Sequence, residues 1–240
     1  EETKYDVIYT DPSRRHDSKG KVFFLKDCEP NIPENLELLL NNCKQLLVKT
    51  SPMLDITVGL KELKYVSEIH IVAVNNEVKE LLWLLDKNID DEPKVKTINF
   101  NKSNKEEFDF GLNNEEITSY ALPLTYLYVP NASIMKSGAF GLLSERFQLD
   151  KLHKHTHLYT SKKLKDFPGR RFIIKNVIPY HKKEIKDFLK NKKANIATRN
   201  FPESVSTIRK KWGIKDGGSK YLFFTTLENN QKVILDCSKV

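Results

Sequence analysis

Residues 5–15 read YDVIYTDPSRR, an apolar and β-favouring run that leads directly into Asp-Pro. This pattern is typical of a parallel strand that ends at the carboxyl edge of an α/β sheet. Ligands of open α/β sheets bind at that edge, so we expect Asp11 to lie beside a ligand, with Pro12 fixing the backbone after it. The same spacing also fits an ordinary strand, a proline turn and a solvated basic loop.

Strands and helices alternate after this segment, which favours a parallel or mixed sheet. The second strand ends in Thr50-Ser51-Pro52, so we expect Lys49, Thr50 and Ser51 at the same sheet edge as Asp11. The predicted strands are 5–10, 45–49, 68–74 and 94–100, and the predicted helices start at Asn31 and cover 53–66 and 77–85.

The polar and acidic residues 101–118 are interpreted as a linker between domains. The order of elements after the linker is that of an α+β domain with a split βαβ arrangement. The predicted strands are 124–129, 156–160, 171–177 and 194–198, the helices are 132–147, 182–190 and 202–212, and the closing hairpin is 221–226 with 232–235.

Charge is distributed unevenly along the chain. Residues 1–120 hold 16 Lys and Arg against 23 Asp and Glu, a balance of −7, whereas residues 121–240 hold 24 against 9, a balance of +15. Such an asymmetry indicates a C-terminal half that faces a polyanion, although a solvated Lys-rich surface would give the same count. The candidate RNA contacts are Arg170, Arg171, Lys182, Lys183, Arg199, Arg209, Lys210 and Lys211.

Other function classes find little support. The chain has no apolar run long enough to span a membrane, and its three cysteines have no metal-ligand spacing, which favours cytosolic thiols. His153, His155 and His157 alternate, but no Cys or carboxylate completes a zinc site, so we expect no metal. The first residue is Glu, which suggests a piece of a longer protein.

Three motifs carry a resemblance to a known family. Residues 11–15 (DPSRR) resemble the fourth-strand motif of class I S-adenosylmethionine-dependent methyltransferases. Residues 126–138 (YLYVPNASIMKSG), continued by THLYTS at 156–161 and FPGR at 167–170, look like the ferredoxin-like segment of one bacterial subfamily of these enzymes. Residues 171–240, with TRNFP at 198–202 and KDGG at 215–218, are similar to the THUMP-like domain of that subfamily.

The resemblance implies a fold and a domain order. The fold is α/β, a partial Rossmann-like methyltransferase sheet, followed by an α+β ferredoxin-like and THUMP-like region. The implied boundaries are 1–102 for the C-terminal half of the methyltransferase domain, 103–170 for the linker and ferredoxin-like segment, and 171–240 for the THUMP-like domain. The glycine-rich cofactor loop of the family follows the first strand of the sheet, so it is expected upstream of residue 1.

The resemblance also implies site residues. Asp11, Pro12 and Ser13 would form the catalytic edge, while Arg14, Arg15, Lys49, Thr50 and Ser51 would bind substrate. Many amino methyltransferases carry an aromatic residue where this chain has arginines. These arginines suit a phosphate or carboxylate of the substrate, or alternatively an internal ion pair.

The implied function is that of the C-terminal part of a cytoplasmic methyltransferase that uses S-adenosylmethionine and acts on RNA, either tRNA or rRNA. We expect this chain alone to bind the cofactor weakly or not at all. The alternative is a non-catalytic RNA-binding or interaction module. One bare edge of the predicted sheet would also permit a homodimer.

Overall fold

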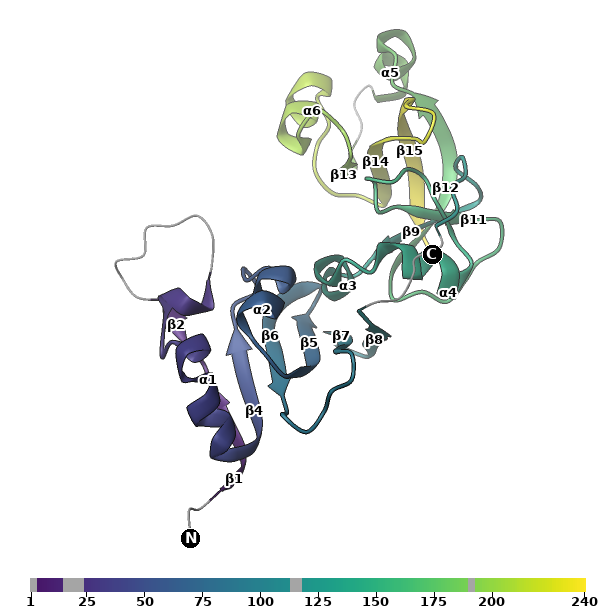
Figure 1. The fold of residues 1–240 in the computed structure, drawn as a ribbon. Helices are drawn as coiled ribbons and strands as arrows, with labels where there is room; N and C mark the ends of the chain where they lie inside the picture. The colour runs from purple at the N-terminus through teal and green to yellow at the C-terminus, as the bar shows by residue number, and fades with distance from the viewer. Residues whose placement is uncertain (1–3, 15–23, 113–117, 190–192) are drawn as a thin grey trace. The chain divides into compact units, whose positions relative to one another are not determined.

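The computed structural model describes residues 4–14, 24–112, 118–189 and 193–240. The chain divides into two compact units (Figure 1). We call Glu1–Glu115 with Ala132–Gly138 the N-terminal unit, and Glu116–Asn131 with Ala139–Val240 the C-terminal unit. Together they form the predicted mixture of an α/β sheet and an α+β region.

The N-terminal unit is built on a six-stranded mixed sheet with the order β1-β4-β6-β5-β7-β8. The pairs β1–β4 and β5–β7 are parallel, and the other neighbouring pairs are antiparallel. The strands are β1 (Tyr5–Thr10), β4 (Cys43–Thr50), β5 (Val66–Val74), β6 (Glu77–Leu85), β7 (Lys94–Phe100) and β8 (Lys105–Gly111). The four predicted strands of this half are therefore confirmed as β1, β4, β5 and β7.

Two helices connect the strands of this sheet. Helix α1 (Ile32–Asn41) begins at Asn31, whose Oδ1 accepts a hydrogen bond from the Glu34 amide at 3.2 Å. Helix α2 (Ile56–Glu62) begins at Asp55, whose carboxylate accepts from the amides of Thr57 and Val58. Such N-caps satisfy amide groups that have no partner inside the helix. A short 3₁₀ turn, η1 (Leu25–Asp27), and the strand pair β2 (Ser13–Arg14) and β3 (Cys28–Glu29) complete the unit.

Two predictions in this unit are wrong. Residues 77–85 form strand β6 rather than a helix, because Asn75 and Asn76 adopt positive φ angles and close a two-residue hairpin. Residues 105–111 of the expected linker form strand β8, in which Phe108 and Phe110 point to the core while Glu107 and Asp109 are exposed. Alternate burial of this kind is the signature of a strand with one covered face.

The outer edge of β1 has no strand partner among the residues that the structure describes. Tyr5, Val7 and Tyr9 share one face of this strand and are 59%, 51% and 56% exposed. An uncovered edge strand can pair with another chain. Dimerisation through this edge stays a prediction.

The C-terminal unit contains a seven-stranded sheet with the order β10-β11-β9-β12-β15-β14-β13. Only β13 and β14 pair in parallel within this described sheet. The strands are β9 (Tyr126–Pro130), β10 (Asp150–Lys151), β11 (Tyr159–Ser161), β12 (Gly169–Pro179), β13 (Asn195–Arg199), β14 (Lys220–Thr226) and β15 (Lys232–Lys239). The helices are α4 (Phe140–Phe147), α5 (Lys182–Leu189) and α6 (Val205–Trp212).

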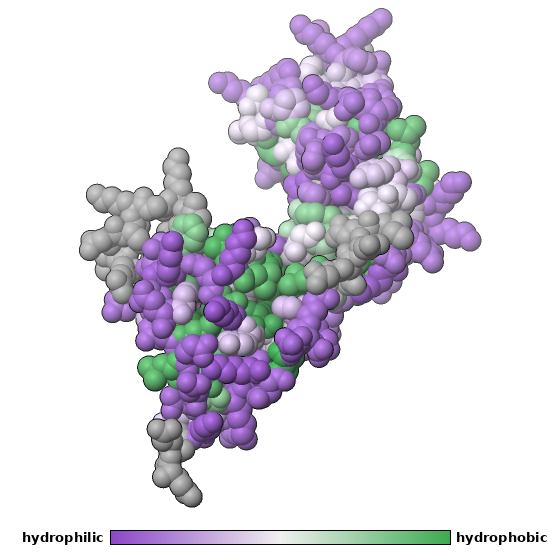
Figure 2. All heavy atoms as spheres, in the orientation of Figure 1, coloured by the Kyte–Doolittle hydropathy of each residue, from purple (hydrophilic) through white to green (hydrophobic). Residues whose placement is uncertain are grey.

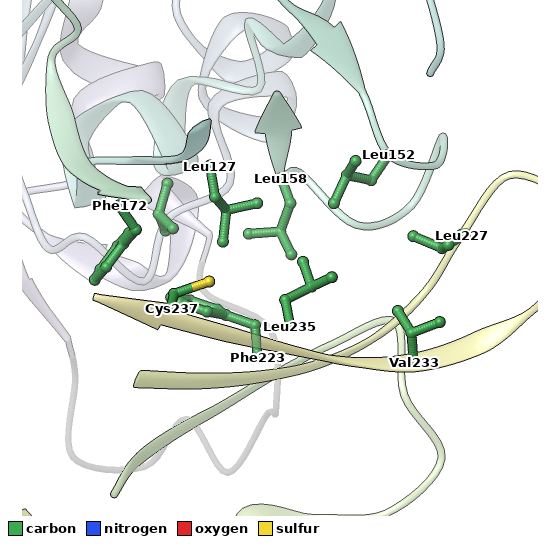
Figure 3. Close-up of a cluster of buried hydrophobic side chains, with 10 residues drawn as sticks. Leu127, Leu152, Leu158, Phe172, Phe223, Leu227, Val233, Leu235 and Cys237 are labelled. Atoms are coloured by element: carbon green, nitrogen blue, oxygen red, sulfur yellow. The ribbon is translucent and has the colours of Figure 1, made fainter. Parts of the chain in front are cut away.

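Both faces of this sheet are covered by apolar clusters. Alternate residues of β14 and β15 point to opposite sides: Phe223 and Leu235 to one, Phe224 and Ile234 to the other. On the first side they meet Leu127, Leu152, Leu158 and Phe172 (Figure 3). On the second side they meet Ile185 and Leu189 of α5 and Ile208 of α6.

The predicted single helix over 132–147 is divided into two. Gly138, with φ +78°, separates α3 (Ala132–Ser137) from α4. Helix α3 packs on the sheet of the N-terminal unit, where the Ala132 amide donates to Asn76 Oδ1 and Lys136 Nζ donates to the Leu54 carbonyl. None of the helices in the described residues has the length and hydropathy needed to cross a membrane.

Candidate functional site

Six of the predicted site residues, Asp11, Pro12, Ser13, Lys49, Thr50 and Ser51, lie together at the carboxyl edge of β1 and β4. These strands are parallel, with Thr10 opposite Val48, so Asp11, which follows β1, lies beside Lys49 near the end of β4. Lys49 Nζ lies 2.5 Å from Asp11 Oδ2. The prediction that Asp11 and Lys49 share one edge therefore agrees with the geometry.

A pocket of about 340 Å³ opens at this edge, and we call it the edge pocket. Its lining includes all three residues predicted as catalytic and three of those predicted to bind substrate. The lining residues are Asp11, Pro12, Ser13, Lys49, Thr50, Ser51, Met53, Lys79 and Glu80. Lys79 and Glu80 were not predicted, because they belong to β6, which lies beside β4 in the sheet.

The Asp11–Lys49 ion pair is partly open to solvent, with the side chains 49% and 30% exposed. Its hydrogen bond raises the pKa of Lys49 above the ordinary value, which more than offsets the opposing effect of burial. Lys49 is therefore a stable cation at neutral pH, and it holds the Asp11 carboxylate at the mouth of the pocket. A partly exposed pair can exchange partners at little cost in free energy.

Thr50 has a structural role that the sequence did not indicate. Its side chain is 1% exposed, and its Oγ1 accepts a hydrogen bond from Trp83 Nε1 at 2.9 Å. The Trp83 ring packs against Gly59 of α2, where a Cβ atom would lie 2.3 Å from Cη2 of the indole. The Thr50 hydroxyl is thus used inside the core, where it fixes the end of β4 beneath the pocket.

The loop after β4 is held by several polar contacts. The Met53 amide donates to Ser51 Oγ at 3.2 Å, and the Leu54 amide donates to the Ser51 carbonyl at 3.1 Å. Lys136 of α3 donates to the Leu54 carbonyl at 2.8 Å, and burial lowers the pKa of its ammonium group. The wall of the edge pocket formed by Ser51 and Met53 is therefore supported by a residue more than 80 positions away.

The two arginines after Ser13 are only partly placed. Arg14 lies in β2, with its backbone opposite Cys28 of β3. Its side chain and the whole of Arg15 lie outside the described residues. Their predicted contact with substrate stays a prediction.

The basic residues predicted to contact RNA fall into two groups. The first group consists of five residues that already contact other parts of the C-terminal unit or are buried in it. Three of them form ion pairs: Arg171 with Asp166, Arg209 with Asp216, and Lys211 with Glu203. Arg170 lies over the Phe172 ring at 5.9 Å, and Arg199 is largely buried, which lowers the pKa of its guanidinium.

The second group consists of Lys182, Lys183 and Lys210. They are exposed on α5 and α6 and form no ion pair with any described residue. Hydrophilic side chains dominate the visible surface of these two helices (Figure 2).

The three alternating histidines do not converge on a metal. His153 Nδ1 receives hydrogen bonds from the His155 amide and from Asn200 Nδ2. His157 stacks on Phe140 with 3.6 Å between ring centroids. Burial, reinforced by nearby Lys151 and Arg199, lowers the pKa of His157 from 6.5 to about 4. Within the described residues, no group of three or more His, Cys, Asp or Glu side chains is placed to hold a metal ion.

Comparison with known proteins identifies the C-terminal region. A family described as a ferredoxin-like domain matches residues 126–168, and a family described as THUMP domain-like matches residues 169–239. The chain contains a ferredoxin-like and a THUMP-like domain. The THUMP-like domain thus covers β12 to β15 with helices α5 and α6.

A crystal structure from Porphyromonas gingivalis W83, described as a "putative methyltransferase", is similar to nearly the whole chain. The TM-score is 0.87 at 34% sequence identity, and the match covers 98% of this chain and 60% of that one. The predicted resemblance to a methyltransferase with ferredoxin-like and THUMP-like domains is confirmed. The chain spans less than two thirds of the length of this structure. No curated protein matches the chain.

The described residues do not by themselves fit S-adenosylmethionine. None of the described connections that follow β1, β4, β5 and β7 at this edge contains the glycine-rich turn that brings a backbone close to a cofactor. The edge pocket instead offers two carboxylates, ammonium groups and hydroxyl groups. This chemistry suits a polar acceptor group better than a complete nucleoside cofactor.

Proposed function

We propose that this chain is the C-terminal part of a cytoplasmic S-adenosylmethionine-dependent methyltransferase that acts on RNA. The observation that carries the proposal is the edge pocket with its Asp11–Lys49 pair, in a chain that follows the P. gingivalis structure over 98% of its length. The edge pocket would hold the acceptor group. The THUMP-like domain would hold the rest of the substrate.

Methyl transfer depends on an in-line approach, so the acceptor must be positioned more than it must be deprotonated. When its ion pair with Lys49 opens, the Asp11 carboxylate can accept a hydrogen bond from the amine or hydroxyl group of the substrate that is to be methylated. Lys49, and the two arginines that follow Ser13, would hold a phosphate or carboxylate of the substrate. Thr50 would contribute by fixing the end of β4.

Cofactor binding would require residues beyond those described. We expect this chain alone to bind S-adenosylmethionine weakly or not at all, since no described turn at the edge supplies a glycine-rich loop. Micromolar binding in isothermal titration calorimetry would contradict this expectation.

The RNA part of the proposal rests on Lys182, Lys183 and Lys210 of α5 and α6, which form no ion pair with any residue that the structure describes. Each phosphate contact to single-stranded RNA steepens the dependence of log affinity on log salt by about 0.7. Changing Lys182, Lys183 and Lys210 together to Glu should therefore reduce the slope by roughly 2 and weaken binding at low salt. RNA titrations of the intact chain at several salt concentrations measure both effects.

A matched control changes the same number of charges elsewhere in the THUMP-like domain. Lys175, Lys220 and Lys239 are also exposed and lie on strands rather than on α5 and α6. Their change to Glu should lower affinity less. Equal losses in both variants would indicate a diffuse charge effect, and an absence of binding at low salt would exclude RNA as the acceptor.

The alternative is an RNA-binding or interaction module without catalysis. The coding region upstream of residue 1 distinguishes the two, because the enzyme requires a strand followed by a glycine-rich loop there.

A further inference from the structure

A second pocket lies in the THUMP-like domain, between the start of α5 and the end of α6. Its volume is about 520 Å³, and we call it the aromatic pocket. Its lining residues are Tyr180, Lys182, Ile185, Lys211 and Trp212. Ile185 belongs to the buried cluster beneath the two helices, so one wall of the pocket is part of the core.

A hydrogen-bond network fixes the aromatic rings. The Tyr180 hydroxyl donates to Glu203 Oε1 at 2.7 Å and accepts from Trp212 Nε1 at 3.3 Å. Lys211 Nζ lies 3.0 Å from Glu203 Oε2 and 3.4 Å from the Tyr180 hydroxyl. Edge contacts with Phe201 and Phe224 hold the Tyr180 ring from behind. The pocket is therefore formed before any ligand arrives.

The electrostatics of the pocket favour an anion beside a flat apolar group. Lys211 Nζ lies 5.5 Å from the Tyr180 ring centroid and 5.4 Å from that of Trp212. Hydrogen bonds from Tyr180 and Lys211 outweigh burial and keep the pKa of Glu203 below its ordinary value, so its carboxylate remains committed to this network. Lys182 lines the same pocket and forms no ion pair with any described residue.

We propose that the aromatic pocket binds one unpaired nucleotide of the RNA, with the base against Trp212 and Tyr180 and the adjoining phosphate near Lys182. The proposal rests on the function proposed above and assigns it a site. Bases stack on aromatic side chains without regard to sequence, because every base has a π face. Bases within a duplex are already stacked on one another, so the pocket selects single-stranded segments.

The two tryptophans of the chain allow a direct test. Trp83 is buried in the N-terminal unit and donates a hydrogen bond to Thr50, whereas Trp212 lines the aromatic pocket. The intact chain is titrated with uridine and adenosine monophosphates, with a single-stranded oligouridylate and with an RNA duplex. Indole N–H signals in ¹⁵N-correlated NMR spectra report each tryptophan separately, and a Trp212→Phe variant assigns them.

The inference predicts that mononucleotides and the single strand shift the Trp212 signal and leave the Trp83 signal in place. Trp212→Ala should weaken single-strand binding about 5- to 150-fold, the range expected for one stacked base, and leave duplex binding unchanged. Trp212→Phe, which keeps a ring, should recover most of the affinity. The NMR titration of the unaltered chain tests the inference even if Trp212→Ala fails to fold.

The possible failures are distinct. If the chain binds single-stranded RNA in a salt-dependent way while the Trp212 signal and the affinity of Trp212→Ala do not change, the aromatic pocket is not the site and the proposed function stands. If no RNA binds at low salt, the RNA function fails. In that case a Trp212 shift with mononucleotides would still support the pocket, and its absence would overturn it.

Discussion

Asp11 is the residue on which the proposed chemistry depends most. It occupies the carboxyl edge of β1, and its only ion pair in the described part of the chain is with Lys49. In the full methyltransferase proposed above, Asp11→Ala should lower methyl incorporation into RNA by about a hundredfold, as expected when an acceptor is misplaced. Unchanged RNA affinity in the same variant would separate a positioning role from a binding role.

Lys49→Met provides the comparison for Asp11. This variant removes the ammonium group that pairs with Asp11 but keeps the Asp11 carboxylate. Methyl incorporation into RNA should therefore fall less than in Asp11→Ala. Activity at the unaltered level in both variants would remove the edge pocket from the mechanism.

Gly59 tests the support beneath the pocket. In Gly59→Ala the new methyl group would lie 2.3 Å from the Trp83 ring, which must shift and weaken its bond to Thr50. We expect a loss of about 1–3 kcal/mol in the free energy of unfolding, although Ala favours a helix more than Gly does. Urea unfolding followed by the near-ultraviolet signal of tryptophan measures this loss.

Gly111→Ala is the matched control for Gly59→Ala. There the added Cβ would lie 3.3 Å from the flexible end of Glu92, which can move aside. A Gly59→Ala variant as stable as Gly111→Ala would contradict the packing argument.

His157 should make stability depend on pH. Its pKa is lowered from 6.5 to about 4, so between these values the unfolded chain takes up a proton that the folded chain does not. Stability present at pH 7 is therefore lost progressively as the pH falls from 6.5 towards 4, by up to about 3 kcal/mol for a shift of this size.

Urea unfolding at pH 7 and pH 5 measures the effect. A His157→Asn variant, which tolerates the positive φ angle at this position, should show a smaller change between the two pH values. His181→Asn, at an exposed histidine, serves as the control and should behave like the unaltered chain. An equal loss in the unaltered chain and in His157→Asn would assign the effect to other groups.

At the scale of elements, β1 and β4, which end at the edge pocket, were predicted as strands from the sequence. Strand β6, which lies between β4 and β5 in the sheet, was not. The run of leucines in 77–85 satisfies a helical period as well as alternation, and only the positive φ angles of Asn75 and Asn76 decide for a hairpin. Because β6 inserts beside β4, Lys79 and Glu80 reach the pocket. Local pattern could place Asp11 and Lys49 together through two parallel strands, but it could not supply a neighbour that depends on strand order.

Strand β8 was missed for a different physical reason. Its exposed face carries the charged residues Lys105, Glu107 and Asp109, which are typical of a linker, while only Phe108 and Phe110 mark the buried face. Similarly, the count of basic residues did not show that Arg171, Arg209 and Lys211 are held in ion pairs. A count of charged residues predicts whether a surface is positive or negative overall. It does not predict which charges are paired, because ion-pair partners are brought together only by the tertiary structure.

At the scale of the whole molecule, helix α3 belongs to one unit while its neighbours in sequence belong to the other. Ile134 of α3 and Leu143 of α4 are both fully buried and both lie within the ferredoxin-like match. Ile134→Ala should lower the stability of the N-terminal unit by about 2–5 kcal/mol, and Leu143→Ala should do so for the C-terminal unit.

The two tryptophans again serve as reporters. In a urea titration, Ile134→Ala should shift the transition seen at Trp83, and Leu143→Ala should shift the one seen at Trp212. If both variants shift both transitions equally, the two units unfold as one.

Because α3 belongs to the N-terminal unit while the segments on either side of it belong to the C-terminal unit, the two units cannot easily be separated by recombination between genes. The chain crosses between the units after residues 115, 131 and 138, so no single cut separates them. A recombination event that transferred residues 126–240 to another protein would carry a helix whose binding surface stays behind. The recipient would have to offer the sheet face formed by β5, β6 and β7, together with Asn76 and the Leu54 carbonyl. We therefore expect these C-terminal domains to be passed on together with the sheet that precedes them, and not as a portable cassette.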